Sequence, residues 1–194
     1  SPNEKIVLFV GRPEPFKGPD VLIRALPHMR DTANTRLVLV GGSEGEHSFD
    51  WLRLLAAELG VAERVSWHVA VPQEQLIDFY AATDITAMPS FHESFGLVAL
   101  ESMASGRPVV ASAVGALATQ IVDGQTGRLV AAHDPVDFAY CMDDILGSPR
   151  ALQSAGEKAV IHARAFTWTR AAEQALQGYL RAAHGFVERA QLSH

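Results

Sequence analysis

Short apolar runs, rich in β-branched residues, alternate along the chain with stretches whose apolar residues recur at helical spacing. The runs predict strands at 6–10, 36–40, 65–69, 85–88, 109–111 and 126–130, since a continuously apolar strand is typically buried on both faces of a sheet. The helical spacing predicts helices at 18–29, 49–59, 73–82, 135–146, 150–165 and 169–183, with one more after a loop at 92–96. This alternation predicts an α/β fold: a Rossmann-like open parallel sheet with helices on both faces and C-terminal helices appended.

The composition fits one compact lobe and narrows its partners. The chain has 194 residues, of which 48% are hydrophobic, enough for a packed core in one domain or in one lobe of a larger enzyme. The net charge of −6, without a basic block, argues against nucleic acid as a partner. The single cysteine, Cys141, allows no internal disulfide and fits a reducing compartment, so we expect a cytoplasmic protein. The apolar runs are too short to span a membrane.

Glycine and charged residues follow four of the predicted strands. Gly11-Arg12 to Lys17-Gly18 follows the first strand, Gly41-Gly42 stops the second, the loop at 92–96 follows the fourth, and Gly115 follows the fifth. The carboxyl ends of parallel strands share one edge of the sheet, where ligands bind in open α/β folds. We therefore expect these segments to form one site. Gly115 would leave room for a ligand to approach the main chain, but taken alone it is better interpreted as an ordinary turn residue.

The most informative segment carries two carboxylates, Glu93 and Glu101, with seven residues between them. Ser94-Phe95-Gly96 lies between them as a loop leading into a helix, so Glu93 stands on the loop and Glu101 inside an apolar helix. The free N–H groups of a helix start suit a phosphate, and carboxylates accept hydrogen bonds from hydroxyl groups. Together they predict a site for a nucleotide diphosphate sugar.

Each of these residues also has a purely structural interpretation. Arg12 and Lys17 suit a diphosphate, but exposed cations are common on any surface. Glu93 can cap the helix, as Ser94 can instead. Glu101 should be largely buried and needs partners, which either a ribose diol or backbone N–H groups would supply. The histidines do not cluster at metal-ligand spacing and the sequence has no Asp-x-Asp triplet, so we expect no metal and no cofactor.

Taken in order, these motifs resemble one known family. Gly11-Arg12, Lys17-Gly18, Gly41-Gly42, Glu93 with Glu101, and the segments 106–110 and 123–127 are similar to the C-terminal, donor-binding lobe of retaining GT-B glycosyltransferases, family 4. The resemblance covers almost the whole chain, 1–194, as a single lobe, and implies an N-terminal acceptor lobe that this sequence does not contain. Within the family, the enzymes that transfer N-acetylglucosamine to inositol phosphate in mycothiol synthesis are most similar in three segments: 16–20, 93–99 and 133–135.

The resemblance implies a role for each matching position. Arg12 and Lys17 would bind and stabilise the diphosphate, Glu93 would hold the sugar, and these three are the expected catalytic residues. Glu101 would bind the ribose, and the base would rest against residues 68–72, where Val71 stands in place of an arginine that such enzymes use. The expected donor-binding residues are Arg12, Lys17, Gly18, Gly41, Val69, Val71, Phe95, Gly96, Leu97 and Glu101.

The expected activity is retaining hexosyl transfer, without a metal, from a nucleotide diphosphate sugar, a UDP-sugar first of all, to a hydroxyl acceptor. The acceptor would be held mainly by the missing lobe, so this chain alone should turn over little. For the full-length enzyme, both attachment at a membrane surface and a homodimer stay open. The alternative is a sugar-nucleotide-binding module or sensor without chemistry, which would need Arg12, Lys17 and Glu101 but not Glu93.

Overall fold

The computed structural model of the chain describes residues 4–43, 47–131 and 133–191. The chain divides into two compact units, residues 1–163 and residues 164–194. The first unit contains the whole sheet and every predicted site residue, and the second contains the last helix.

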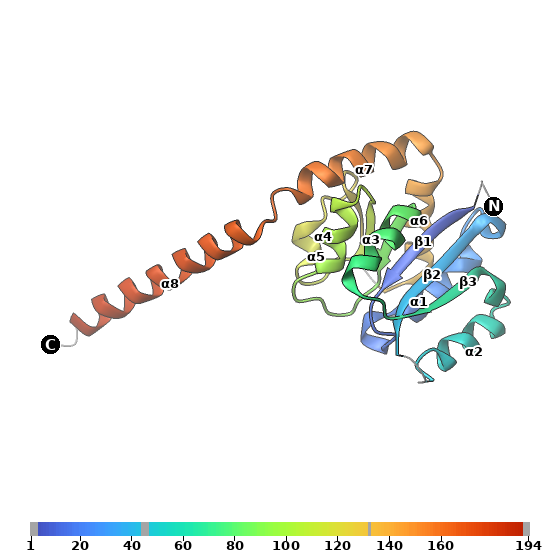
Figure 1. Cartoon of the computed structure of the whole chain (residues 1–194), viewed down its shortest axis with the longest axis horizontal. Coiled ribbons are helices and arrows are strands. Elements are labelled where there is room, and N and C mark those ends of the chain that lie inside the picture. The colour runs from blue at the N-terminus through green and yellow to red at the C-terminus, as the bar shows by residue number, and fades with distance from the viewer. Residues whose placement is uncertain (1–3, 44–46, 132, 192–194) are drawn as a thin grey trace. The chain divides into compact units, whose positions relative to one another are not determined.

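The sheet of the first unit has six strands, all parallel (Figure 1). The strands are β1 (Lys5–Val10), β2 (Thr35–Gly42), β3 (Val65–Val69), β4 (Ile85–Met88), β5 (Val109–Ser112) and β6 (Gly127–Val130). Their order in the sheet is β3-β2-β1-β4-β5-β6. The predicted α/β fold with an open parallel sheet is therefore confirmed. The order reverses between β1 and β4, so a crevice opens at the carboxyl ends of these two strands.

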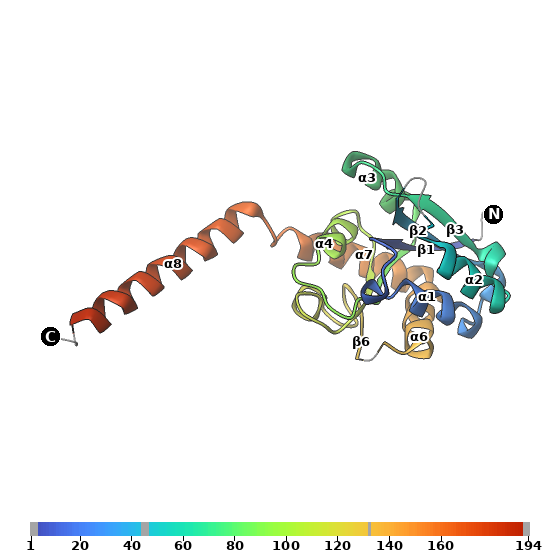
Figure 2. The same ribbon diagram turned by 90° about the horizontal axis from the view of Figure 1, so that it is seen from below.

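Helices cover both faces of this sheet, as Figure 2 shows from the edge. On one face α1 (Pro19–Ala25), α2 (Asp50–Glu58) and α6 (Pro135–Leu146) enclose a core that contains Leu22, Leu39 and Phe138. On the other face lie α3 (Gln73–Ala82), α4 (Leu97–Ala104) and α5 (Leu117–Gln120), and α7 (Pro149–Ala163) packs against α4. Four 3-10 turns complete the unit: η1 (Pro15–Lys17), η2 (Leu26–His28), η3 (Thr32–Asn34) and η4 (Ala62–Arg64).

Two predicted boundaries are wrong and one helix was missed, each for a physical reason. The helix predicted at 18–29 ends at Ala25 and continues only as the turn η2, because Pro27 has no N–H to donate to the preceding turn. The second strand does not stop before its two glycines: it runs to Gly42, whose carbonyl accepts a hydrogen bond from the N–H of Ala70 at 2.7 Å. The helix α5 was not predicted, since four residues are too few to show a helical period.

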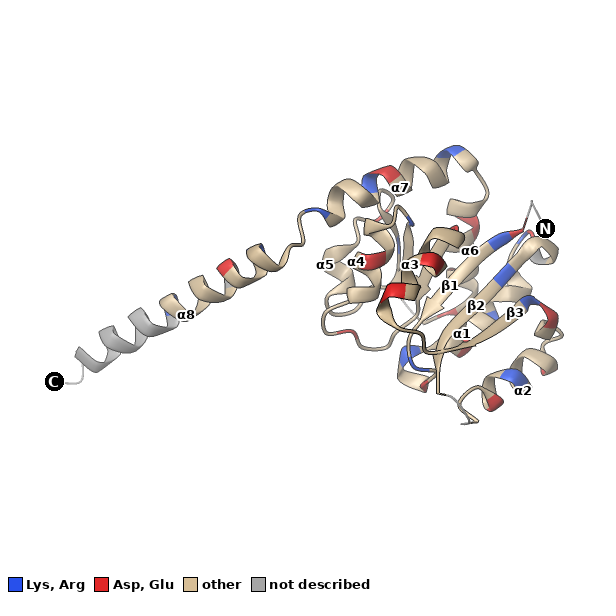
Figure 3. Cartoon of the chain, viewed as in Figure 1, with Lys and Arg blue, Asp and Glu red and all other residues tan. Residues whose placement is uncertain are grey.

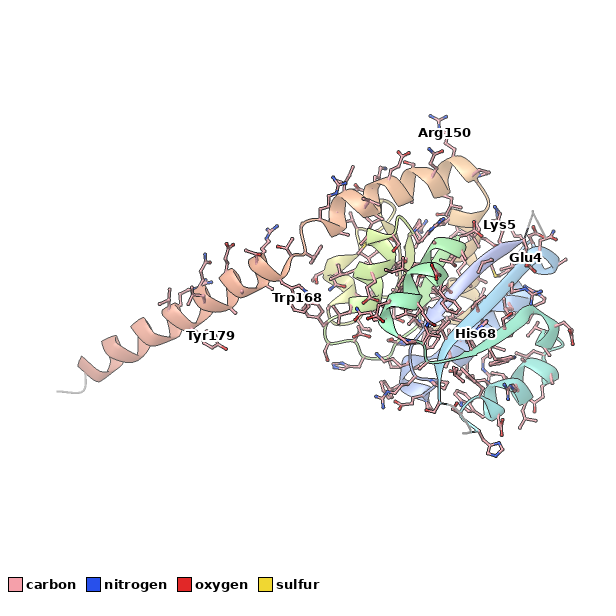
Figure 4. All side chains as sticks on the ribbon, in the orientation of Figure 1. Glu4, Lys5, His68, Arg150, Trp168 and Tyr179 are labelled. Atoms are coloured by element: carbon pink, nitrogen blue, oxygen red, sulfur yellow. The ribbon has the colours of Figure 1, made fainter. Side chains whose placement is uncertain are left out.

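The second unit contains α8 (Trp168–Gln191), which is longer than the helix predicted at 169–183. Its large apolar side chains Trp168, Leu176, Tyr179 and Leu180 recur at helical spacing and are all exposed (Trp168 and Tyr179 are labelled in Figure 4). One side of α8 is thus an apolar stripe. Within residues 4–43, 47–131 and 133–191, no helix is both long and apolar enough to cross a bilayer.

Candidate active site

The loop that follows β1 is held against the loop that follows β4. The turn η1 brings Lys17 to the end of this loop, and Gly18 then starts α1 with a left-handed backbone, φ +68°. A Cβ on Gly18 would lie 2.3 Å from the carbonyl oxygen of Pro89, so only glycine fits at this close approach. The N–H of Phe91 also donates to the carbonyl of Phe16, at 2.8 Å.

This contact places Lys17 beside Glu93, 76 residues later in the chain. Lys17 Nζ lies 2.8 Å from Glu93 Oε2, and the two side chains are 26% and 13% exposed. The second oxygen of Glu93 accepts the N–H of Gly96 at 3.2 Å. Glu93 therefore joins the cation of one loop to Gly96, the residue that precedes α4. Its role in holding a donor sugar stays a prediction. Ser94 does not cap the helix: its hydroxyl lies 3.5 Å from His92 Nε2.

The surroundings of Glu93 keep it ionised. Burial by itself would raise the pKa of this carboxyl group, because the charged form loses water. The hydrogen bond and the charge of Lys17 act in the opposite direction, as do the N–H groups of Gly96 and Phe95, and together they lower the pKa below its ordinary value. The carboxylate occupies the helix start with the same kinds of donor that would bind a phosphate oxygen.

A pocket of about 190 Å³ opens at the crevice between β1 and β4. Five of the predicted site residues line it, together with Gly11 and the ends of the two strands: Lys17, Glu93, Phe95, Gly96 and Leu97. Ala99 and Leu100 are the first residues of α4 whose N–H groups bond back to the carbonyl of Gly96. The N–H groups of Leu97 and Val98 thus precede the helical hydrogen bonds, as expected at a helix start.

Arg12 lies on the same loop as Lys17 but does not line this pocket. Its side chain is 71% exposed and pairs with Glu14 at 2.8 Å. The guanidinium carbon also lies 5.9 Å from the centre of the Phe16 ring. A side chain this long and exposed can reorient at little cost, so its predicted contact with a diphosphate stays a prediction.

Glu101 forms a second group of contacts, with helix α3. The hydroxyl of Tyr80 donates to Glu101 Oε2 at 2.9 Å, and Gln73 Nε2 donates to Oε1 at 3.0 Å. Glu101 is half-buried, so the expectation of a largely buried carboxylate is wrong, because α3 covers it from one side only. Sequence reasoning missed Gln73 and Tyr80, although a tyrosine at an apolar helix position signals a hydroxyl that needs a partner.

The segment expected to face the base adjoins this second group. Val71 packs against the cluster that contains Tyr80, Leu8 and Val40. Val69 is exposed at the end of β3, on the edge strand where Figure 4 labels His68. Gly41 brings β2 close to β1, since a Cβ there would lie 2.1 Å from the carbonyl oxygen of Gly11. These residues lie on the same edge of the sheet as Glu101's partners but outside the 190 Å³ pocket.

The helix α5 and the turn before it support the loop that carries Glu93. The N–H of Ala116 donates to the carbonyl of Glu93 at 3.1 Å, and Gln120 Nε2 donates to the carbonyl of Phe95. A Cβ on Gly115 would lie 1.9 Å from the carbonyl oxygen of Glu93. The room at Gly115 is therefore taken by the main chain of Glu93, which agrees with the preferred interpretation of Gly115 as a turn residue.

Among the described residues, the charged side chains form no group that could bind a metal ion. Acidic and basic residues are interspersed along the described ribbon, as Figure 3 shows. Among the residues that the structure describes, no three His, Cys, Asp or Glu side chains converge as metal ligands do. The expectation of catalysis without a metal stays a prediction.

Lys17, Glu93 and the start of α4 meet at the switch point of a parallel sheet, with Glu101 further along the same helix, an arrangement that suits a nucleotide diphosphate sugar. The chain belongs to the family of group 1 glycosyl transferases, whose family model matches residues 1–161. The resemblance inferred from the motifs is thus confirmed.

Two curated relatives of the chain are also glycosyltransferases. The D-inositol 3-phosphate glycosyltransferase of Nocardia farcinica is 46% identical over 184 residues, which are 92% of this chain and 41% of that protein. The enzyme of the same name from Corynebacterium diphtheriae is 44% identical over 180 residues, 89% of this chain and 41% of that protein. The chain therefore spans less than half the length of these relatives.

Solved structures show the same lobe. Sucrose-phosphate synthase from Thermosynechococcus elongatus has a TM-score of 0.82 and 33% identity, over 95% of this chain and 47% of that one. Anabaena HepE in complex with UDP-glucose has a TM-score of 0.78 and 26% identity, over 93% of this chain and 49% of that one. The Rossmann-like lobe of a GT-B glycosyltransferase is therefore the fold of the first unit.

Proposed function

We propose that the chain is the donor-binding lobe of a retaining glycosyltransferase that uses a nucleotide diphosphate sugar, with UDP as the nucleotide. One observation carries the proposal: Lys17, Glu93 and the start of α4 line one pocket at the switch point of the sheet. The UDP and UDP-glucose complexes of HepE support the choice of nucleotide. The names of the curated relatives support inositol phosphate as the acceptor.

In this proposal each group acts on one part of the donor. Lys17 and Arg12, with the N–H group of Leu97, hold the diphosphate, and Glu93 holds the sugar while it keeps the N–H groups of Phe95 and Gly96. The bond from the anomeric carbon to the diphosphate oxygen breaks as the acceptor oxygen bonds to the same face of that carbon. The diphosphate takes the acceptor's proton. Negative charge grows on the leaving oxygen, where a cation and a helix start stabilise it; losing one such donor typically costs about 10²- to 10³-fold in rate.

For the diphosphate to use Lys17, the ammonium must be shared between the phosphate and Glu93 or exchanged from one to the other. A lysine has three N–H donors, so it can keep Glu93 and still bind a phosphate oxygen. Glu93 would then remain fixed beside the sugar while Lys17 neutralises the leaving group. A carboxylate beside the expected place of the sugar favours the enzyme over a sensor without chemistry, which would need Glu93 only as the partner of Lys17.

The acceptor side of the reaction is assigned to sequence outside this chain. The chain spans 41% of the two curated relatives, and the pocket is open at the crevice. We therefore expect the 194-residue chain to bind the donor weakly and to show little or no transfer. Transfer by this chain alone at the rate of a full-length relative would contradict the assignment of the acceptor site.

Calorimetric titration of UDP-, GDP- and ADP-sugars tests the donor site. We expect the UDP-sugar to bind most tightly, and Lys17→Ala and Glu101→Ala each to weaken it about tenfold or more, as the loss of a charged hydrogen bond does. Lys158→Ala on α7 and Glu58→Ala on α2 are matched controls, since both side chains are exposed and lie away from the pocket. UDP-sugar binding that is unchanged in Lys17→Ala and Glu101→Ala would refute the site.

A further inference from the structure

Glu101 is held by two partners that differ in one respect: one is buried and the other is exposed. Tyr80 is 2% exposed and its hydroxyl donates to Oε2, whereas Gln73 is exposed and its amide donates to Oε1. Both come from α3, which follows directly after the segment 69–72 at the end of β3. The carboxylate is therefore fixed from the protein side and loosely covered from the solvent side.

Tyr80 is a permanent partner because the whole residue is buried. The ring lies in a cluster with Leu8, Val40 and Val71, and a buried hydroxyl without an acceptor would be costly. Burial, then the charge of Glu101 and the hydrogen bond to it, raise the pKa of Tyr80, so the phenol stays protonated as the donor. Tyr80 thus sets the direction in which the carboxylate points.

Gln73 can leave the carboxylate at little cost. An exposed amide that loses one hydrogen bond gains another from water, so the net change is small. A ligand can reach Glu101 only from the exposed side, where Gln73 donates to Oε1. Two vicinal hydroxyls that donate to the carboxylate from this side must take over that contact.

We propose that Tyr80 is a positioning residue that holds the Glu101 carboxylate toward the vicinal hydroxyls of a nucleoside ribose, and that Gln73 gives up its contact when the ribose binds. The inference rests on the proposed function, since it assigns the ribose to Glu101. It adds that the affinity for the ribose is set by α3, none of whose residues lines the diphosphate pocket.

The test compares UDP with 2′-deoxy-UDP, which lacks one of the two hydroxyls, by calorimetry on the whole chain. The quantity of interest is the ratio of the two dissociation constants, because a change in overall packing alters both constants alike. We expect UDP to bind about tenfold more tightly than 2′-deoxy-UDP, which is the effect of one charged hydrogen bond. Glu101→Gln should bring the ratio close to one.

Tyr80→Phe keeps the ring and removes only the hydroxyl. We expect the ratio to fall to about two- or threefold, because the carboxylate loses its orientation, while the affinity for 2′-deoxy-UDP stays the same. Gln73→Ala should leave the ratio unchanged or raise it only slightly, because Gln73 gives up its contact at little cost. The matched controls are Tyr140→Phe on α6 and Gln75→Ala on α3, both exposed positions that should leave the ratio unchanged.

The outcomes separate this inference from the function on which it rests. If the unaltered chain binds neither nucleotide, the proposed function is refuted. If it discriminates between them and loses discrimination in Glu101→Gln but keeps it in Tyr80→Phe, the positioning role alone is refuted. A ratio that falls in Gln73→Ala refutes the exchange, because Gln73 would then be needed for the ribose to bind. Should Tyr80→Phe not fold, Gln73→Ala still tests the exchange, since that change affects only an exposed side chain.

Discussion

At the scale of single residues, the pocket is lined by a carboxylate of the protein, that of Glu93. The Glu93 carboxylate takes the ammonium of Lys17 and the N–H groups at the start of α4. Leaving these donors without an acceptor would cost free energy, because they are half-buried. Glu93 therefore keeps the pocket in shape and keeps Lys17 where a diphosphate can meet it.

The lowered pKa of Glu93 predicts how stability depends on pH. The folded protein binds this proton less tightly than the unfolded chain, whose carboxyl has the ordinary value of 4.5. The stabilisation by the Lys17–Glu93 pair is thus fully present above that value and is lost as the pH falls through the lower pKa of the folded state. Urea unfolding of the wild-type chain and of Glu93→Gln, measured from neutral to acidic pH, should show a difference in stability that disappears in acid.

The control for this measurement is Glu58→Gln, at an exposed position on α2, which should show little difference at any pH. A wild-type advantage over Glu93→Gln that grows on acidification would show that Glu93 is not stabilised in its charged form.

The residues of the site were predictable to the extent that they follow strands. Lys17, Glu93 and Gly96 each stand near the carboxyl end of a strand, and parallel pairing brings such ends together. Tyr80, Gln73 and Gln120 lie on helices, and nothing in their spacing tells which loop or carboxylate they contact. Their roles depend on how α3 and α5 pack, which is decided by tertiary contacts rather than by local pattern.

At the scale of elements, the loop that carries Glu93 depends on the short helix α5 and the turn before it. The long elements were predicted well: β3, α3, β4 and α6 have the bounds that their apolar periods indicated. A helix of four residues has no period to detect, and it is stable only because Leu117 is buried and its ends are bonded to neighbours. The element that escaped prediction is thus the one that fixes the main chain of Glu93.

Replacing Gly115 by alanine tests this support. Gly115 and Gly124 both have positive φ, +48° and +71°, but a Cβ on Gly124 meets nothing within 4 Å. Gly124→Ala should therefore cost only the left-handed backbone, about 1–2 kcal/mol. Gly115→Ala should cost about 1–3 kcal/mol more, because the Glu93 carbonyl must move away. Denaturant unfolding measures both, and calorimetry should show weaker UDP binding for Gly115→Ala alone.

Equal losses of stability in the two variants would show that the loop yields to the added methyl group. The support that α5 gives to Glu93 would then be weaker than the contact implies.

At the scale of the whole molecule, the first unit should be independent of the second. The sheet, the pocket and both clusters around Glu93 and Glu101 lie within residues 1–163. Ending the chain at residue 163 should change the melting temperature by less than about 2 °C, since side chains that are exposed contribute little to stability. Differential scanning calorimetry measures this change, and the affinity for UDP should be the same.

The control ends the chain at residue 148 and removes α7, which packs against α4 and α6; this should destabilise the protein strongly. A large loss of stability on removing only residues 164–194 would show that α8 belongs to the same cooperative unit.

The ion pair between Lys17 and Glu93 joins two loops that lie 76 residues apart in the chain. Closing so long a loop costs entropy that local helices and turns do not have to overcome. During synthesis the loop with Lys17 leaves the ribosome well before Glu93 exists, and it can take its final place only when β4 pairs with β1. The donor site is therefore completed late in folding. A nascent or partly folded chain, in which the two loops have not yet met, should not bind a nucleotide sugar.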